Sequence, residues 1–227
     1  MDDLTLIIPA KNEEVSLPHV LDELVKYKYK IIVVLEESDL STIKSITNKN
    51  CKILFQKGKG YGDALINGIH NVDSKYFCIF NADGSFIPEE IKNMLDLVKN
   101  NTADLIFGSR YMKGGSSEDD TIITLVGNKI FTFLGNLFFS LNLSDILYTF
   151  VIGKTHLTKK LNLKEKKFSF CVELPIKAKR FKYKIISYPC HERIRIGGIK
   201  KVNAFKDGLL ILFSMIKLFF FTKSETK

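Results

Sequence analysis

The chain has 227 residues, of which 45% are hydrophobic and 26% charged, so one α/β domain with a sizeable core is expected and a disordered chain is excluded. Its four cysteines are scattered and form no Cys-x-x-Cys pair, which favours buried, reduced thiols over disulfides or a zinc site. The formal net charge is +9.

The charge is unevenly distributed along the chain. Residues 1–153 carry a net charge of −5, whereas residues 154–227 carry +14. The basic part is interleaved with long apolar runs and contains no recognised nucleic-acid-binding motif. We therefore expect it to face anionic lipid headgroups and not nucleic acid.

The first two-thirds of the chain alternates short β-branched runs with helical stretches, which predicts a mostly parallel sheet with helices on both faces. The expected strands are Leu4–Ile8, Lys30–Leu35, Lys52–Phe55, Tyr76–Phe80 and Asp104–Phe107. The expected helices between them are Glu14–Tyr27, Thr42–Asn48, Tyr61–Asn71 and Glu89–Lys99.

Two later segments are strongly apolar, Ile122–Leu143 and Gly208–Phe221. Neither is an uninterrupted run of about 20 apolar residues, so a membrane-spanning helix is disfavoured and a core helix is the simplest reading of each. In the second segment, three consecutive phenylalanines beside Lys217 favour a helix lying in a membrane interface. The chain is accordingly divided into a domain at 1–204 and an apolar, basic interfacial helix at 205–227.

A polar cluster follows each of the five predicted strands. The clusters are Pro9–Glu14, Glu36–Asp39, Lys57–Gly62, Asn81–Ser85 and Gly108–Tyr111. Ligands of parallel α/β sheets bind beyond the carboxyl ends of the strands. One such cluster is most simply a solvated loop, but five in succession predict a binding site at this edge of the sheet.

The residue types in these clusters suit a diphosphate with a cation. Glycines and lysines in the third cluster allow close backbone approach and supply positive charge to phosphate oxygens. Asp83 follows a strand that is expected to be buried, so its carboxylate is expected at the rim of the sheet. A divalent cation that bridges a diphosphate needs only one or two protein carboxylates. The alternative for Asp83 is a turn at the start of the next helix.

The order of the motifs resembles a known family. The motifs are Pro9-x-x-Asn12-Glu13, the acidic cluster, Gly58-Lys59-Gly60, Asp83 after its strand, Gly108-Ser109-Arg110 and Ser144-Asp145. In this order they resemble the inverting family-two glycosyltransferases of GT-A fold, in particular the dolichyl-phosphate mannosyltransferase and polyprenyl-phosphate glycosyltransferase branch. The resemblance runs from about Leu4 to Leu212.

The resemblance implies a role for each matching position. Donor-binding residues would be Pro9, Asn12, Glu13, Glu37, Lys59, Asn81 and Arg110. Asp83 would hold Mg²⁺ or Mn²⁺ and take part in catalysis. Asp145 would be the catalytic carboxylate on the acceptor side: it would orient a phosphate acceptor or act as the base for a sugar hydroxyl. Arg193, Arg195 and Lys201 would contact phosphates of the donor or the acceptor, unless this late basic run is only a solvated loop.

The sequence also departs from the family pattern. Asn81 replaces the first acid of the metal motif, Glu36–Asp39 replaces the usual Asp-Asp-Gly-Ser, and Lys200 replaces a serine. No glycine precedes Phe150, where the family usually has one. These changes put metal affinity and donor identity in question.

The resemblance implies transfer of a sugar, with inversion, from a nucleoside diphosphate sugar to a polyprenyl phosphate or a glycan acceptor. No secretory leader is apparent after Met1, so we expect a cytoplasmic protein that is peripheral at the inner face of the membrane. The alternative is a non-catalytic, membrane-associated partner of an active glycosyltransferase, which Asn81 supports best. The sugar, the nucleotide base and the oligomeric state are not encoded in these motifs.

Overall fold

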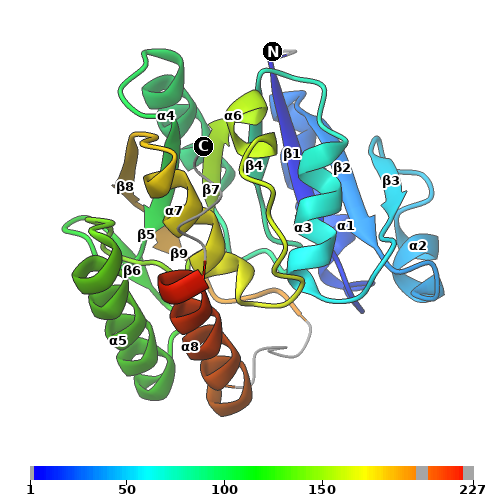
Figure 1. Cartoon of the computed structure of the whole chain (residues 1–227). Coiled ribbons are helices and arrows are strands. Elements are labelled where there is room, and N and C mark those ends of the chain that lie inside the picture. The colour runs from blue at the N-terminus through cyan, green and yellow to red at the C-terminus, as the bar shows by residue number, and fades with distance from the viewer. Residues whose placement is uncertain (1–2, 198–203, 222–227) are drawn as a thin grey trace.

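A seven-stranded sheet forms the centre of the computed structural model, which describes residues 3–197 and 204–221 (Figure 1). The strand order is β3-β2-β1-β4-β7-β5-β8. The strands are β1 Leu4–Pro9, β2 Lys30–Leu35, β3 Lys52–Phe55, β4 Tyr76–Ile79, β5 Leu105–Ser109, β7 Val151–Lys154 and β8 Ile185–Pro189. A separate short pair joins β6 Ser116–Ser117 to β9 His191–Glu192.

Helices cover both faces of the sheet. They are α1 Ser16–Leu24 with a 3-10 turn Val25–Tyr27, α2 Leu40–Ser45, α3 Tyr61–His70, α4 Pro88–Lys99, α5 Ile122–Phe139, α6 Thr155–Lys159, α7 Phe170–Arg180 and α8 Ala204–Phe221. Side chains alternate along β1, so that Ile7 packs with α3 and α7 while Leu6 and Ile8 pack with α1 and α4. The sheet is therefore buried on both faces, as its apolar strands predict.

The predicted mostly parallel sheet is confirmed, with one difference. β7 pairs antiparallel to both β4 and β5, between which it lies. Neither β7 nor the edge strand β8 was among the predicted strands. The four residues of β7 carry no polar alternation, and no pattern in the sequence encodes strand direction. The insertion of β7 places the loop before it, Ser144–Phe150, at the same edge of the sheet as the ends of β4 and β5.

α5 and α8 lie side by side on one flank of the molecule (Figure 1). Gly208 faces the ring of Phe131, and the ring of Phe219 lies 5.8 Å from that of Phe138, so the two helices run in the same direction. α8 contributes Ile211 and Met215 to the core. One side of α8 is therefore packed on the domain, and the other is exposed.

The prediction of a core helix in residues 122–143 is wrong, because α5 is largely exposed. Only Thr132 and Gly135 are buried in this helix, and its exposed apolar side chains are Ile122, Ile123, Val126, Ile130, Phe133, Leu137 and Phe138. Within the described part of the chain, α5 is also the one helix that is long and apolar enough to cross a membrane, with 17% of that window buried.

Candidate functional site

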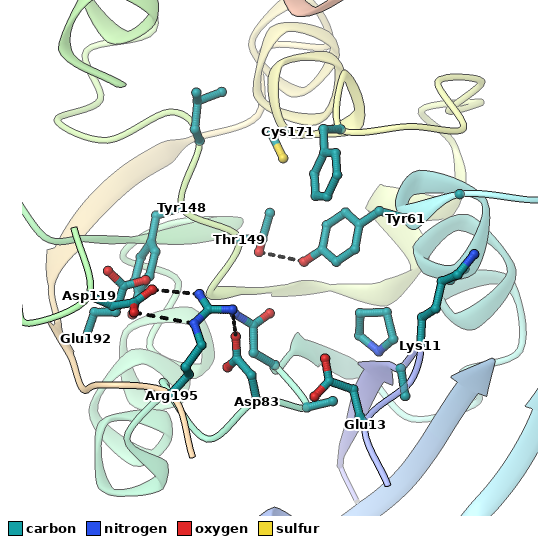
Figure 2. A pocket seen from close by; sticks show the side chains of 18 of the residues that line it. Lys11, Glu13, Tyr61, Asp83, Asp119, Tyr148, Thr149, Cys171, Glu192 and Arg195 are labelled. Carbon is teal, nitrogen blue, oxygen red and sulfur yellow. Dashed lines mark hydrogen bonds and ion pairs between the residues drawn. The ribbon is translucent and has the colours of Figure 1, made fainter. Parts of the chain in front are cut away.

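A pocket of about 550 Å³ opens at the carboxyl ends of β1 and β4 (Figure 2). Its sheet side consists of residues that follow these two strands and of the first turn of α3, namely Pro9, Ala10, Lys11, Glu13, Gly60, Tyr61, Ala64, Asn81, Ala82 and Asp83. Its loop side comes from the loop after β5 and the start of α5, from the loop before β7, and from the region of β9. These residues are Arg110, Asp119, Asp120, Thr124, Asn128, Tyr148, Thr149, Glu192 and Arg195.

Asp83 lies on a tight turn after β4 and uses its two carboxylate oxygens differently. Oδ1 accepts hydrogen bonds from the backbone N–H of Ser85 at 3.0 Å and from the Ser85 hydroxyl at 2.7 Å. Oδ2 lies 3.7 Å from a guanidinium nitrogen of Arg195. Asn81 donates to the Ser85 hydroxyl at 3.4 Å, so its side chain belongs to the same turn. Oδ1 of Asp83 is thus engaged within the turn, and Oδ2 is the oxygen that faces the positive charge of Arg195.

The segment after β9 is fastened to this turn. The backbone N–H of Ile196 donates to the Asp83 carbonyl at 2.8 Å, and that of Arg193 donates to the Ser85 carbonyl at 2.9 Å. Gly84 has φ +82° and the Ile196 side chain fills the place that a Cβ would take, so this position requires glycine. Arg195 is consequently held over the pocket by its own backbone.

Asp145 and Arg110 form a buried ion pair. The Arg110 Nε donates to Asp145 Oδ2 at 2.8 Å and a terminal nitrogen donates to Oδ1 at 3.2 Å. Asp145 is fully buried and does not line the pocket, whereas Arg110 does. Burial opposes the charge of Arg110, but Asp145 and then Glu192 raise its pKa well above the ordinary value. The geometry makes Asp145 the residue that orients Arg110, which stacks 4.7 Å from the ring of Tyr148.

Two further carboxylates surround Arg110 on the loop side. Glu192 accepts from Arg110 at 3.2 Å and from the Ser117 hydroxyl at 2.5 Å. Asp120 accepts from the Tyr111 hydroxyl and lies 3.5 Å from Arg110. Burial raises the pKa of Glu192, and Arg110 opposes that shift. This side of the pocket therefore holds more carboxylates than cations among the described residues.

The loop after β1 is held by α2. Asn12 has φ +51°, and its backbone N–H donates to Asp39 Oδ2 at 2.7 Å. The backbone N–H of Glu13 donates to the Thr42 hydroxyl at 2.9 Å. Asp39 also caps α2 by accepting from the backbone of Thr42. Asp39 thereby fixes the course of the chain into the pocket, a role that the sequence did not reveal.

The structure separates the sequence-predicted residues into two groups. Those that line the pocket are Pro9, Glu13, Asn81, Asp83, Arg110 and Arg195. Those that lie outside its wall are Asn12, Glu37, Lys59, Asp145 and Arg193. Lys201 lies outside the described residues.

Each residue outside the wall has an observable position. Glu37 and Lys59 are exposed, while their neighbours Glu36 and Gly60 line the pocket. Arg193 forms two 3.0 Å hydrogen bonds to Glu23 and a further one to the Phe86 carbonyl, so it braces the turn from outside. Only for Glu37 does a neighbouring residue, Glu36, bring the expected kind of charge to the pocket wall.

Several residues of the loop side were not predicted from the sequence. Asp119 and Asp120 stand immediately before α5, where acids also occur simply as helix-opening residues. Their position in a Glu-Asp-Asp run was the available signal. Cys171 lines the pocket too, but burial raises the pKa of its thiol to about 12, so it is not a thiolate nucleophile at neutral pH.

Residues 5–161 match the glycosyl transferase family 2. The chain belongs to that family. Dolichol-phosphate mannosyltransferase of Pyrococcus furiosus is 30% identical over 125 residues, covering 51% of this chain and 35% of that protein. The UDP-N-acetylglucosamine–dolichyl-phosphate N-acetylglucosaminyltransferase of Methanococcus voltae is 25% identical over 208 residues, covering 81% of this chain and 83% of that protein.

A solved structure with the same fold is glucosyl-3-phosphoglycerate synthase of Mycobacterium tuberculosis, in complex with Mn²⁺, UDP and glucosyl-3-phosphoglycerate. The TM-score is 0.73 at 12% identity, and the alignment covers 96% of this chain and 80% of that one. This likeness shows the GT-A-like fold. Together with the family it makes the chain a nucleotide-sugar glycosyltransferase, as its motifs predicted.

Proposed function

We propose that the chain transfers a sugar, with inversion, from a nucleoside diphosphate sugar to a polyprenyl phosphate. The observation that carries the proposal is the pocket at the ends of β1 and β4, into which Oδ2 of Asp83 faces. In open α/β sheets this is the edge where ligands bind. The donor then occupies the sheet side of the pocket, and the acceptor approaches from the loop side.

The residues present fit a divalent cation that is shared with a diphosphate. Asp83 Oδ2 and the Asn81 side-chain oxygen are hard oxygen donors on one turn, and Mg²⁺ and Mn²⁺ prefer such donors. Among the described residues there is no group of three or more His, Cys, Asp or Glu side chains able to hold an ion alone. Phosphate oxygens of the donor would therefore supply further ligands to the cation. A bound cation would stabilise negative charge on the leaving diphosphate.

The protein's own side chains have distinct parts in this reaction. Asp83 would hold the cation, and Arg195, which lies beside Asp83 on the loop side, would bind the diphosphate of the donor. Arg110 is kept extended toward the pocket by buried Asp145. A preorganised guanidinium of this kind stabilises phosphate charge without reorganisation during the reaction.

A lipid-linked acceptor fits the surroundings of the pocket. Asn128 of α5 and Ile211 of α8 both line it, and the exposed apolar sides of these helices lie beside its loop side. An acceptor phosphate is already an anionic nucleophile and needs no strong general base. A glycan hydroxyl would need one. Asp145 is enclosed behind Arg110, so that base would have to come from a carboxylate of the pocket wall.

We also propose that the protein binds the cytoplasmic face of a membrane through the joint apolar surface of α5 and α8. The α8 part of this surface consists of the exposed side chains Phe205, Leu209, Leu212, Phe213, Ile216, Phe219 and Phe220. So large an exposed apolar patch is typical of an interaction site. The net charge of +14 after residue 153 supports an anionic bilayer as the partner.

The proposal is tested with a panel of radiolabelled UDP- and GDP-sugars and two acceptors, polyprenyl phosphate in vesicles and a soluble oligosaccharide. The expected result is a label that is extracted into organic solvent and that depends on Mn²⁺ or Mg²⁺. Label on the oligosaccharide alone would overturn the lipid acceptor. Nucleotide binding without transfer or donor hydrolysis would favour the non-catalytic partner that Asn81 suggests.

A further inference from the structure

Arg195 lies between the carboxylates of Asp83 and Asp119 (Figure 2). One terminal nitrogen donates to Asp119 Oδ2 at 2.6 Å, Nε donates to Oδ1 at 3.4 Å, and the other terminal nitrogen is 3.7 Å from Asp83 Oδ2. The three side chains are 15–22% exposed. Water therefore screens these charges less than it would at an open surface.

The contact with Arg195 involves the oxygen of Asp83 that a cation would need. Oδ1 is already engaged by the backbone and the hydroxyl of Ser85. A divalent ion on Oδ2 would come close to the guanidinium, and two like charges at such a distance repel each other. Arg195 and a cation therefore compete for the same carboxylate oxygen.

Arg195 is not a loosely placed surface side chain. The neighbouring Ile196 donates its backbone N–H to the carbonyl of Asp83, and its side chain packs on Gly84. The residue that carries the competing charge is thus fixed to the turn that carries Asp83. Asp119, at the end of the loop before α5, holds the guanidinium from the other side.

We propose that Arg195 is the resident counterion of Asp83, so that a divalent cation and a nucleoside diphosphate enter the site together. The inference rests on the proposed function for the identity of these ligands. When the cation takes Oδ2 of Asp83, the guanidinium transfers to the diphosphate. Asp119 is a positioning residue that shares the guanidinium while no diphosphate is present. The metal alone then binds weakly, and the nucleotide completes the site.

The first test measures binding of Mn²⁺ alone to the full chain, from the electron paramagnetic resonance signal of the free ion. Arg195→Ala should bind Mn²⁺ about three- to tenfold more tightly than the wild type, the range that one partly buried ion pair supports. Arg195→Lys keeps the charge and should remain near the wild type. Lys113→Ala, an exposed charge removal after β5, is the matched control and should change nothing.

The second test separates the role of Asp119 from direct metal binding. Asp119→Asn should weaken binding of Mn²⁺ alone, because Arg195 then has Asp83 as its one charged partner of the two and competes more strongly with the ion for it. In an Arg195→Ala background the same substitution should leave Mn²⁺ affinity unchanged. Asp119 acts through the Arg195 guanidinium, so its effect disappears when that group is removed. Glu118→Gln, the neighbouring acid, serves as the control. An equal loss in both backgrounds would mean that Asp119 acts on the ion itself and would overturn its positioning role.

Adding UDP or GDP distinguishes failure of this inference from failure of the proposed function. With Mn²⁺ present, Arg195→Ala should bind the nucleotide more weakly than the wild type, opposite to its effect on the metal alone. If the wild type binds neither nucleotide, the proposed function fails, while the comparison with Mn²⁺ alone still tests the counterion. If the nucleotide binds and Arg195→Ala holds Mn²⁺ no more tightly than the wild type, the counterion inference is wrong.

Discussion

The two sides of the pocket are built in different ways. Most residues of the sheet side lie at or directly after the ends of β1 and β4, so two parallel, hydrogen-bonded strands fix their positions. Residues of the loop side come from three segments that are far apart in sequence: the loop after β5 with the start of α5, the loop before β7, and the region of β9. Ion pairs centred on Arg110 and Arg195 hold these segments together.

This difference has a functional consequence. The sheet side has few ways to move, because two neighbouring parallel strands fix it, and this rigidity suits the binding of the sugar donor. The loop side is held by charges that a ligand with charges of its own can rearrange. We therefore expect acceptor choice and the order of binding to be set on the loop side, and substitutions there to have the more varied effects.

The largest expected effect comes from the buried ion pair behind the loop side. Asp145→Ala leaves the Arg110 guanidinium buried without its main partner, so the free energy of unfolding should fall by about 3–5 kcal/mol. Denaturant unfolding followed by circular dichroism measures it. Asp22→Ala, which removes an exposed ion pair with Lys49, should cost only about 0–1 kcal/mol. Equal, small losses would mean that Asp145 has no structural role.

Substitutions on the sheet side should change the activity of the protein and leave its stability nearly unchanged. Asp83→Asn keeps acceptors for Ser85 but loses the charge that faces the cation, so transfer should fall by at least about 100-fold with little change in unfolding. Asn81→Asp adds a carboxylate to the same turn and should be tolerated, with tighter metal binding. Full activity of Asp83→Asn in the presence of a chelator would contradict the metal assignment.

The apolar flank next to the loop side predicts a change in membrane binding. The double substitution Phe133→Glu in α5 and Phe213→Glu in α8, at two well-exposed positions, should weaken binding to anionic vesicles about tenfold or more. The reason is that burial of one such side chain contributes about 1.5–3 kcal/mol. Phe55→Glu at the far edge of the sheet is the control. Vesicle sedimentation at low and high salt measures the effect. A wild type that ignores vesicles of every composition would refute membrane binding.

The smallest expected effect concerns the pH dependence of stability. Burial raises the pKa of Glu192, so the folded state binds its proton more tightly than the unfolded state does. Its contribution to stability is therefore lost as pH rises from the unfolded value, about 4.3, through the folded one. Glu192→Gln should gain Tm over the wild type by at most about 4 °C, and this gain should grow from pH 4 to pH 8. A gain that shrinks with rising pH would contradict the assigned shift.

The comparison also explains what could be predicted from the sequence. Strands of the sheet side have strong apolar runs followed by polar clusters, so their ends and Asp83 were found within one or two residues. The loop side depends on contacts between distant segments, such as Arg195 with Asp119, which no local pattern encodes. Asp145 was predicted to be a catalytic residue, but the structure buries it behind Arg110, in the loop that the antiparallel strand β7 brings to this edge of the sheet. The exposure of α5 depended on which helices pack beside it.

The central claim is that Asp83 holds the donor's diphosphate through a cation at the sheet side. Calorimetric titration of UDP and GDP into the wild type and Asp83→Asn, each with Mn²⁺ and with a chelator, tests it most directly. The account predicts that one nucleotide binds the wild type at least about tenfold more tightly with Mn²⁺ than with chelator, and that this dependence vanishes in Asp83→Asn. Two results would contradict it. One is a nucleotide that binds both proteins equally strongly with Mn²⁺ and with chelator, and the other is a wild type that binds neither UDP nor GDP.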